Sequence, residues 1–166
     1  MSDPPAGRIV VIGVGHRDRA DDGIGPAVVD ALARRTDRVI TLVREGDLAV
    51  LPLLWEPDDD VVIVDAIIDR GPAGDLRAVD PEQLGSASVV STHGLDVADA
   101  IELARRLRCM PARLRVFGIT AGDFGYGPMS SGLRHGIDRL AAELLNELGC
   151  ESDEMPGDRT TGPLAR

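Results

Sequence analysis

Short, uninterrupted runs of apolar residues alternate along the chain with stretches of helical periodicity. Three of the runs are rich in valine and isoleucine and predict strands buried on both faces of a sheet: residues 8–13, 39–43 and 61–64. Residues 114–119 form a further run of this kind, and residues 76–79 are short enough for an edge strand. Because helical segments separate these strands, the pattern predicts an α/β fold, a three-layer α/β/α sandwich around a mainly parallel, five-stranded twisted sheet.

Between the strands, apolar residues recur at spacings of three and four. This periodicity predicts helices over residues 25–35, 47–55, 97–107 and 133–148. Asp47 can cap the second of these helices, and Gly149 suits the end of the last one. We expect one domain over residues 8–149, preceded by a disordered N-terminus (1–7) and followed by a polar, aperiodic, disordered tail (150–166).

Composition excludes several classes of partner. Acidic residues outnumber basic ones 28 to 18, for a formal charge of −10, and the chain has only one Trp, one Tyr and two Phe. Nucleic-acid binders need a basic face or an aromatic stacking platform, so we expect no nucleic-acid partner. The N-terminus lacks the apolar segment of a signal peptide, and no apolar run approaches the roughly 20 residues that span a bilayer. Cys109 and Cys150 show no CxxC spacing, which indicates reduced thiols. We therefore expect a cytoplasmic monomer with no membrane partner.

Side chains that follow the predicted strands are the candidates for chemistry, because the carboxyl ends of parallel strands meet at one edge of a sheet. Asp22 follows the first strand, with Asp21 beside it, Asp65 follows the third, and His93 precedes helix 97–107. Two carboxylates and an imidazole from three loops suit a borderline divalent cation such as nickel or zinc, with a position open for water or a substrate group. Alternatively, each residue serves the fold: Asp22 and His93 as helix caps, and Asp65 as the partner of an arginine.

A dinucleotide-binding turn is the competing interpretation of the first loop. Gly13, Gly15 and the acidic Glu45 at the end of the second strand resemble parts of that fingerprint. Asp18, however, stands where the third glycine is required, and several residues separate it from the helix. The aspartates of this loop would also repel a pyrophosphate at the point where it must bind. The residues therefore favour a cation over a nucleotide.

Four motifs resemble, in order and in spacing, those of the nickel–iron hydrogenase maturation proteases. Residues 9–25 contain a hydrophobic strand, a GxG turn, and an acidic pair followed by GxG. Residues 61–66 match a strand that ends in Asp-Ala, residues 91–95 a short histidine motif, and residues 117–119 the strand that follows. The resemblance extends from about residue 8 to residue 148, which is nearly all of the predicted domain.

The resemblance implies an activity and a substrate. Members of this family have an α/β/α fold and remove a C-terminal extension from the hydrogenase large subunit once nickel has been inserted. Their three metal-contacting positions correspond to Asp22, Asp65 and His93, which would be both the catalytic and the metal-binding residues. The nickel would then be carried by the substrate, the partner would be the large-subunit precursor, and no resident cofactor is expected. Non-cleaving metal recognition is an alternative for a homologue of this kind.

Some features of the sequence leave the mechanism open. Where the family has an asparagine after GxG, this chain has His16. The difference implies that His16 orients a metal ligand in another way, that it is an added ligand, or that the substrate is unusual. Ser91 and His93 are only two residues apart, so no nucleophile with a partnered histidine is evident, and water would be activated by the metal or by a carboxylate.

Two further surface features can be predicted. Residues 122–131 form a glycine-rich loop in which exposed Tyr126 and Met129 would make a docking edge, although ordinary loop packing is an equal alternative. His135 is expected to face solvent.

Overall fold

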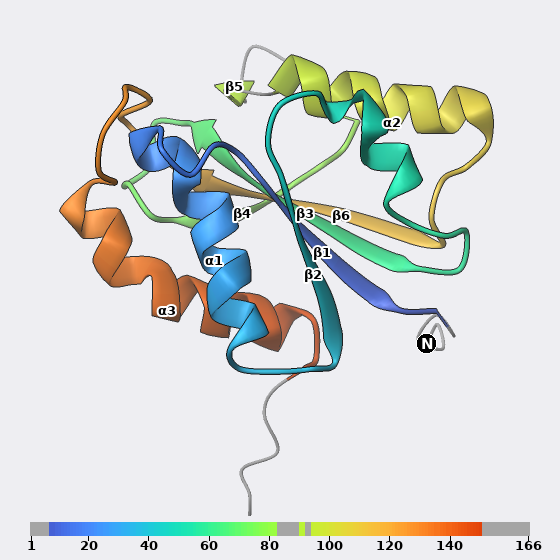
Figure 1. Cartoon of the computed structure of the whole chain (residues 1–166), viewed down its shortest axis with the longest axis horizontal. Helices are drawn as coiled ribbons and strands as arrows, with labels where there is room; N and C mark the ends of the chain where they lie inside the picture. The colour runs from blue at the N-terminus through green and yellow to red at the C-terminus, as the bar shows by residue number, and fades with distance from the viewer. Residues whose placement is uncertain (1–6, 83–89, 92–93, 151–166) are drawn as a thin grey trace, which may run out of the picture.

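The computed structural model describes residues 7–82, 90–91 and 94–150 of the chain (Figure 1). Its strands are β1 (Ile9–Val14), β2 (Val39–Arg44), β3 (Asp60–Ile68), β4 (Leu76–Val79), β5 (Val90–Ser91) and β6 (Arg113–Thr120). Its α-helices are α1 (Ile24–Ala33), α2 (Gly94–Leu107) and α3 (Ser131–Glu147), and its 3-10 helices are η1 (Ala20–Gly23) and η2 (Leu48–Leu53). No helix in the described part of the chain combines the length and the apolar character that crossing a membrane requires.

The strands form one mixed, mostly parallel sheet with the order β2-β1-β3-β6-β4. β1 pairs in parallel with β2 and β3, and β3 pairs in parallel with β6. The edge strand β4 runs antiparallel to β6, and the two-residue β5 adds an antiparallel pair at the end of β3. The predicted fold class is confirmed, including an edge strand at residues 76–79.

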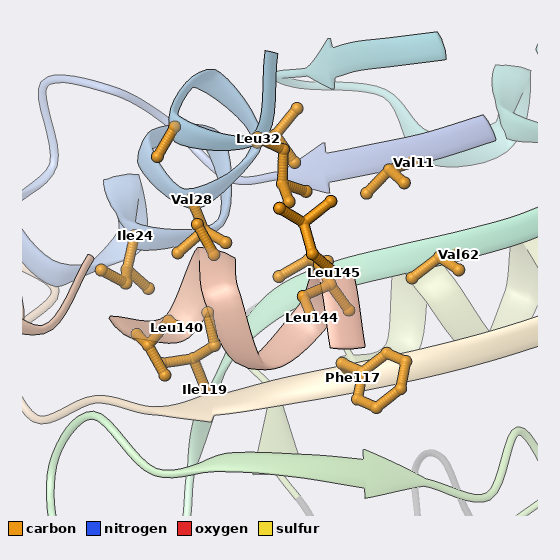
Figure 2. Packing of buried hydrophobic residues seen from close by; sticks show 14 of the residues in the cluster. Val11, Ile24, Val28, Leu32, Val62, Phe117, Ile119, Leu140, Leu144 and Leu145 are labelled. Carbon is orange, nitrogen blue, oxygen red and sulfur yellow. The ribbon is translucent and has the colours of Figure 1, made fainter. Parts of the chain in front are cut away.

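Helices cover both faces of the sheet, so the core has two halves. On one face, α1 and α3 pack on alternate strand residues such as Val11, Val62 and Phe117 (Figure 2). On the other face, α2 and η2 pack on the intervening strand residues, Val10 and Ile63 among them. This alternation follows from the pleat of a strand, which sends successive side chains to opposite faces. The result is the predicted three-layer α/β/α sandwich.

Three predicted boundaries differ from the structure. β3 runs to Ile68, so Asp65 lies inside the strand rather than after it. The predicted helix 47–55 is the shorter 3-10 helix η2, which Asp47 caps by accepting the Ala49 N–H at 2.9 Å. Cys150, assigned from the sequence to the tail, is buried at 4% exposure, so the packed domain extends past residue 149. Residues 1–6 and 151–166 of the predicted termini lie outside the described residues.

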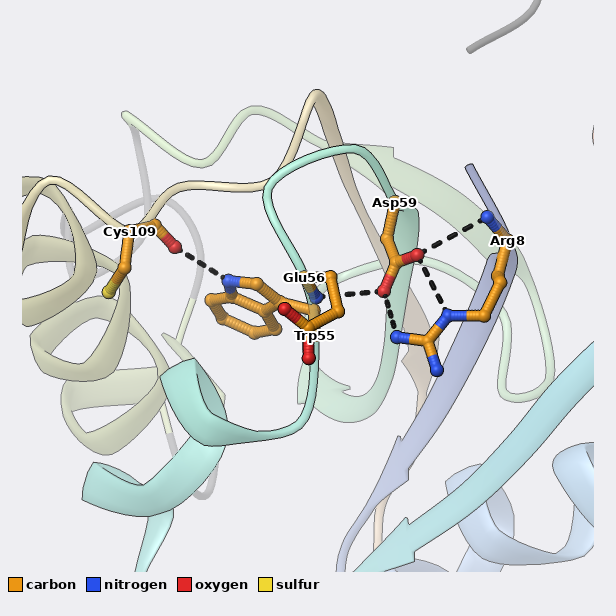
Figure 3. A network of polar contacts seen from close by, with 5 residues as sticks. All are labelled: Arg8, Trp55, Glu56, Asp59 and Cys109. Atoms are coloured by element: carbon orange, nitrogen blue, oxygen red, sulfur yellow. Dashed lines mark hydrogen bonds and ion pairs between the residues drawn. The ribbon is translucent and has the colours of Figure 1, made fainter. Parts of the chain in front are cut away.

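An ion pair between the exposed Arg8 and the buried Asp59 stabilises the amino-terminal edge of the sheet (Figure 3). Asp59, just before β3, accepts the Arg8 backbone N–H at 3.2 Å, two guanidinium N–H groups at 3.0 and 2.6 Å, and the Glu56 N–H at 2.8 Å. The Arg8 guanidinium lowers the pKa of the Asp59 carboxyl although burial opposes the change. Nearby, the Trp55 indole N–H donates to the Cys109 carbonyl at 2.8 Å. Cys109 and Cys150 are both free thiols, as predicted.

Candidate active site

Two glycines allow α1 to begin directly against the sheet. A Cβ on Gly25 would lie 2.6 Å from the Val14 carbonyl oxygen and 2.8 Å from that of Val64. A Cβ on Gly13 would lie 2.8 Å from the Gly25 carbonyl oxygen. Only glycine permits backbones to approach this closely. The 3-10 helix η1, which leads into α1 and carries the acidic pair, is thereby held at the carboxyl ends of β1 and β3.

The turn between β1 and η1 fixes the position of Asp22. Gly15 has φ +131°, and a Cβ there would lie 2.0 Å from the Asp22 carbonyl oxygen. The next residue, His16, donates its backbone N–H to Asp22 Oδ2 at 2.9 Å. Asp22 itself is only 1% exposed, and the N-cap of α1 is Gly23, so Asp22 does not cap that helix. Its carboxylate is therefore oriented by the turn.

Asp65 comes from the central strand. It is paired in register with Gly118 of β6 and is 3% exposed. Because Val61 and Ile63 pack toward α2 and η2, the alternation of the strand sends the Asp65 side chain to the same face. η1 contacts β3, so both predicted carboxylates lie on neighbouring elements at the carboxyl edge of the sheet.

The third predicted residue, His93, lies outside the described residues, immediately before α2 begins at Gly94. Among the described residues, which exclude this histidine, no group of three His, Cys, Asp or Glu side chains could hold a metal ion. The structure thus places two of the three predicted ligands, Asp22 and Asp65. The metal-binding role of all three stays a prediction.

Asp21, the acid beside Asp22 in the sequence, binds groups of the protein itself. Its Oδ1 accepts the Ser130 N–H at 2.8 Å. Its Oδ2 accepts the N–H groups of Gly122 at 3.2 Å and Asp123 at 3.0 Å and the Ser130 hydroxyl at 3.0 Å. Burial raises the pKa of this carboxyl, but the four hydrogen bonds outweigh burial and the pKa is lowered. Asp21 is therefore a link to the segment that follows β6.

His16 closes its own turn. Its Nδ1 accepts the Asp18 N–H at 3.3 Å, and the side chain is half-buried. An asparagine Oδ1 can accept the same hydrogen bond in an Asx turn, so histidine and asparagine can serve this turn in the same way. Glu45, which favoured a nucleotide in the competing interpretation, accepts the Arg17 N–H at 3.1 Å and so supports the same turn.

A pocket of about 570 Å³ opens beside this turn. Its lining comes from the β1–η1 turn, from the start of η2 and from α2: His16, Arg19, Gly46, Asp47, Leu48, Ala49, Asp99, Ala100 and Leu103. His16 joins the pocket to the site, because its side chain lines the pocket and its N–H binds Asp22. Sequence reasoning missed this pocket, since the segments that form it share no motif.

Of the two exposed side chains predicted in the loop 122–131, the structure confirms one. Tyr126 is 86% exposed, as expected, and the Arg19 guanidinium lies 5.6 Å from its ring centroid. Met129, predicted to be exposed, is instead half-buried and packs against the core together with Phe124. His135 is exposed on α3, as predicted.

Comparison with known proteins decides the family. The family model described as "Hydrogenase maturation protease" matches residues 26–147. The chain belongs to the hydrogenase maturation protease family. Family membership makes it a hydrolase, a protease of hydrogenase maturation. The matched range includes Asp65 and begins just after Asp22.

Individual relatives agree with this family assignment. The hydrogenase expression/formation protein HupD of Rhizobium leguminosarum bv. viciae is 26% identical over 99% of this chain and 87% of its own length. The hydrogenase 2 maturation protease of Escherichia coli (strain K12) is 31% identical over 68% of this chain and 72% of its own length. The solved structure of the hydrogenase maturating endopeptidase HybD from E. coli superposes with a TM-score of 0.73 at 24% identity, covering 86% of this chain and 93% of that one. The structural likeness shows that the fold is the same.

Proposed function

We propose that this protein is an endopeptidase that removes the C-terminal extension of a nickel-loaded hydrogenase large-subunit precursor. In this proposal Asp22, Asp65 and His93 contact the nickel that the substrate carries. The observation that supports it most is the pair of buried carboxylates, Asp22 and Asp65, at the carboxyl edge of a sheet in a hydrogenase maturation protease.

The donor set suits a metal that arrives with the substrate. Carboxylate oxygens and an imidazole nitrogen are acceptable ligands for nickel, and three protein ligands leave positions for the precursor's own ligands. Asp22 is oriented before the substrate arrives, because the His16 N–H holds its Oδ2 and the backbone packs closely against it at Gly15. A preoriented carboxylate loses little conformational freedom when it binds.

The reaction is hydrolysis of one peptide bond, with carboxylates at the site as in an aspartic-type endopeptidase. A water oxygen attacks the scissile carbonyl carbon while a proton passes from the water to a basic group at the site. The C–N bond then breaks, and the leaving amine takes up a proton. A nearby cation can neutralise the negative charge that develops on the carbonyl oxygen during the attack.

The pocket beside His16 is the proposed place for the precursor segment next to the cut. It is lined by His16, whose N–H orients Asp22, and its other walls, η2 and α2, belong to the face of the sheet that Asp65 also faces. A peptide in this pocket would be held close to both carboxylates. Binding of this kind places the scissile bond for attack.

Single substitutions test the proposal. Purified Asp22→Ala and Asp65→Ala variants are incubated with nickel-loaded precursor, and mass spectrometry follows the loss of its C-terminal peptide. Asp18→Ala is the matched control, because Asp18 is an exposed acid of the same turn. We expect both site variants to lose cleavage and the control to retain it. Cleavage by both site variants would refute the assignment, and precursor binding by the wild type without cleavage would indicate a non-cleaving homologue.

A further inference from the structure

Backbone hydrogen bonds attach the segment after β6 to η1 and to the turn before it. The backbone N–H of Ala20 donates to the Gly127 carbonyl at 3.0 Å, and that of Asp21 donates to the Asp123 carbonyl at 2.9 Å. In return, the Gly127 N–H donates to the Asp18 carbonyl at 3.3 Å. The two segments are about a hundred residues apart in the chain, so this contact is purely tertiary.

The Asp21 side chain is the centre of that attachment. Its carboxylate collects four hydrogen bonds, all from residues 122, 123 and 130, which are the two ends of the segment. Ala20, just before it, has φ +41°, a strained backbone conformation for a residue with a side chain. Such a conformation persists only where neighbouring contacts hold it in place. The attachment therefore determines the path of the backbone that leads directly into Asp22.

We propose that Asp21 is a positioning residue for the cleavage reaction, which holds Asp22 in place by fastening η1 to residues 122–130. The inference rests on the proposed function, but it assigns Asp21 no contact with the substrate. Adjacent acids in one short element then have separate roles. Asp22 faces the turn and is held by His16, and Asp21 faces the segment after β6.

The chain offers a matched control at the other edge of the sheet. Asp59 is also buried and also accepts four hydrogen bonds, but it lies at the amino-terminal edge, away from Asp22 and Asp65. Asp21→Asn and Asp59→Asn each replace a carboxylate oxygen, which accepts hydrogen bonds, by an NH₂ group that faces the same N–H and O–H donors. Both variants should lose stability, and only Asp21→Asn should move Asp22.

Kinetics with nickel-loaded precursor, at a temperature where circular dichroism shows each variant folded, separates these effects. We expect Asp21→Asn to lower kcat about 100-fold, because a displacement of about 1 Å at a reacting centre costs that much. KM should change less than kcat, since η2 and α2, which supply most of the pocket lining, are not altered. Ser130→Ala, which removes one of the four hydrogen bonds, should lower kcat about fivefold. Asp59→Asn should keep kcat within about twofold. Equal kcat in Asp21→Asn and wild type, or an equal loss in Asp59→Asn, would overturn the inference.

Amide hydrogen exchange tests the same inference without any cleavage. The His16 N–H is protected by its bond to Asp22, so Asp21→Asn should accelerate its exchange at least tenfold while Asp59→Asn leaves it unchanged. Unchanged protection in Asp21→Asn would refute the positioning role even in a protein that cleaves. Faster exchange, in a protein that does not cleave the precursor, would support the positioning role and contradict only the proposed function.

Discussion

Replacing Gly15 by alanine tests how the first turn holds Asp22. The new Cβ would lie 2.0 Å from the Asp22 carbonyl oxygen, whereas ordinary contacts begin at 3.4 Å, so the backbone of η1 must move by more than an ångström. The φ of +131° adds strain of about 1–3 kcal/mol for a residue with a side chain. We expect a total destabilisation of about 3 kcal/mol, which lowers Tm by roughly 6–12 °C in a domain of this size. Catalysis should fall about 100-fold in kcat/KM because Asp22 is displaced.

Gly149→Ala is the control for backbone strain alone. Gly149 also has a positive φ, +66°, but it lies after α3, and no atom of the described residues is within 4 Å of the added Cβ. We expect a loss of about 1 kcal/mol and unchanged kcat/KM. Thermal unfolding and precursor cleavage are measured on both variants. Wild-type cleavage by a folded Gly15→Ala variant would refute the claim that this contact sets the position of Asp22.

Three further predictions concern the acid stability of the fold, the turn and the pocket. Folding lowers the pKa of Asp59. The ionised carboxylate therefore stabilises the fold fully at any pH above its pKa in the unfolded chain, about 3.9, and this stabilisation is lost as the pH falls through its lower pKa in the folded protein. In urea titrations the stability gap between wild type and Asp59→Asn should shrink from pH 5 to pH 3, and a constant gap would contradict this. His16→Asn should keep kcat/KM within about threefold, because asparagine can close the same turn, and a loss comparable to that of Asp22→Ala would indicate a direct role for the imidazole. Ala49→Trp should fill the pocket and raise KM about tenfold with little change in kcat. The control Ala142→Trp, at an exposed position on α3, should change neither constant. Equal KM values in the two variants would show that the pocket does not bind the substrate.

The architecture could be predicted because local signals agree along the chain. Valine- and isoleucine-rich runs gave the buried strands, and the spacing of three and four gave the helices that cover them. The end of β3 was missed because an aspartate breaks the apolar run. Asp65 nevertheless stays in the ladder, since Gly118 of the neighbouring strand pairs with it in register. Tertiary pairing extends the strand beyond the point where local propensity favours it.

The candidate site was harder to predict, because neighbouring residues of one type can have different partners. Asp21 and Asp22 are adjacent and chemically identical in the sequence, and only contacts with residues 122–130 distinguish the first from the second. The pocket likewise combines Ala49 with Leu103, which no short-range pattern connects. Strand ends indicate where acids gather, but the role of each acid depends on which distant backbone it meets.

The most direct test of the central claim is the mass of a large-subunit precursor before and after incubation with the wild-type protein. Two preparations of the same precursor are compared, one loaded with nickel and one free of metal. Because the nickel is proposed to be recognised through Asp22, Asp65 and His93, only the loaded precursor should lose its C-terminal extension. Equal cleavage of both preparations, or cleavage of neither, would contradict the account.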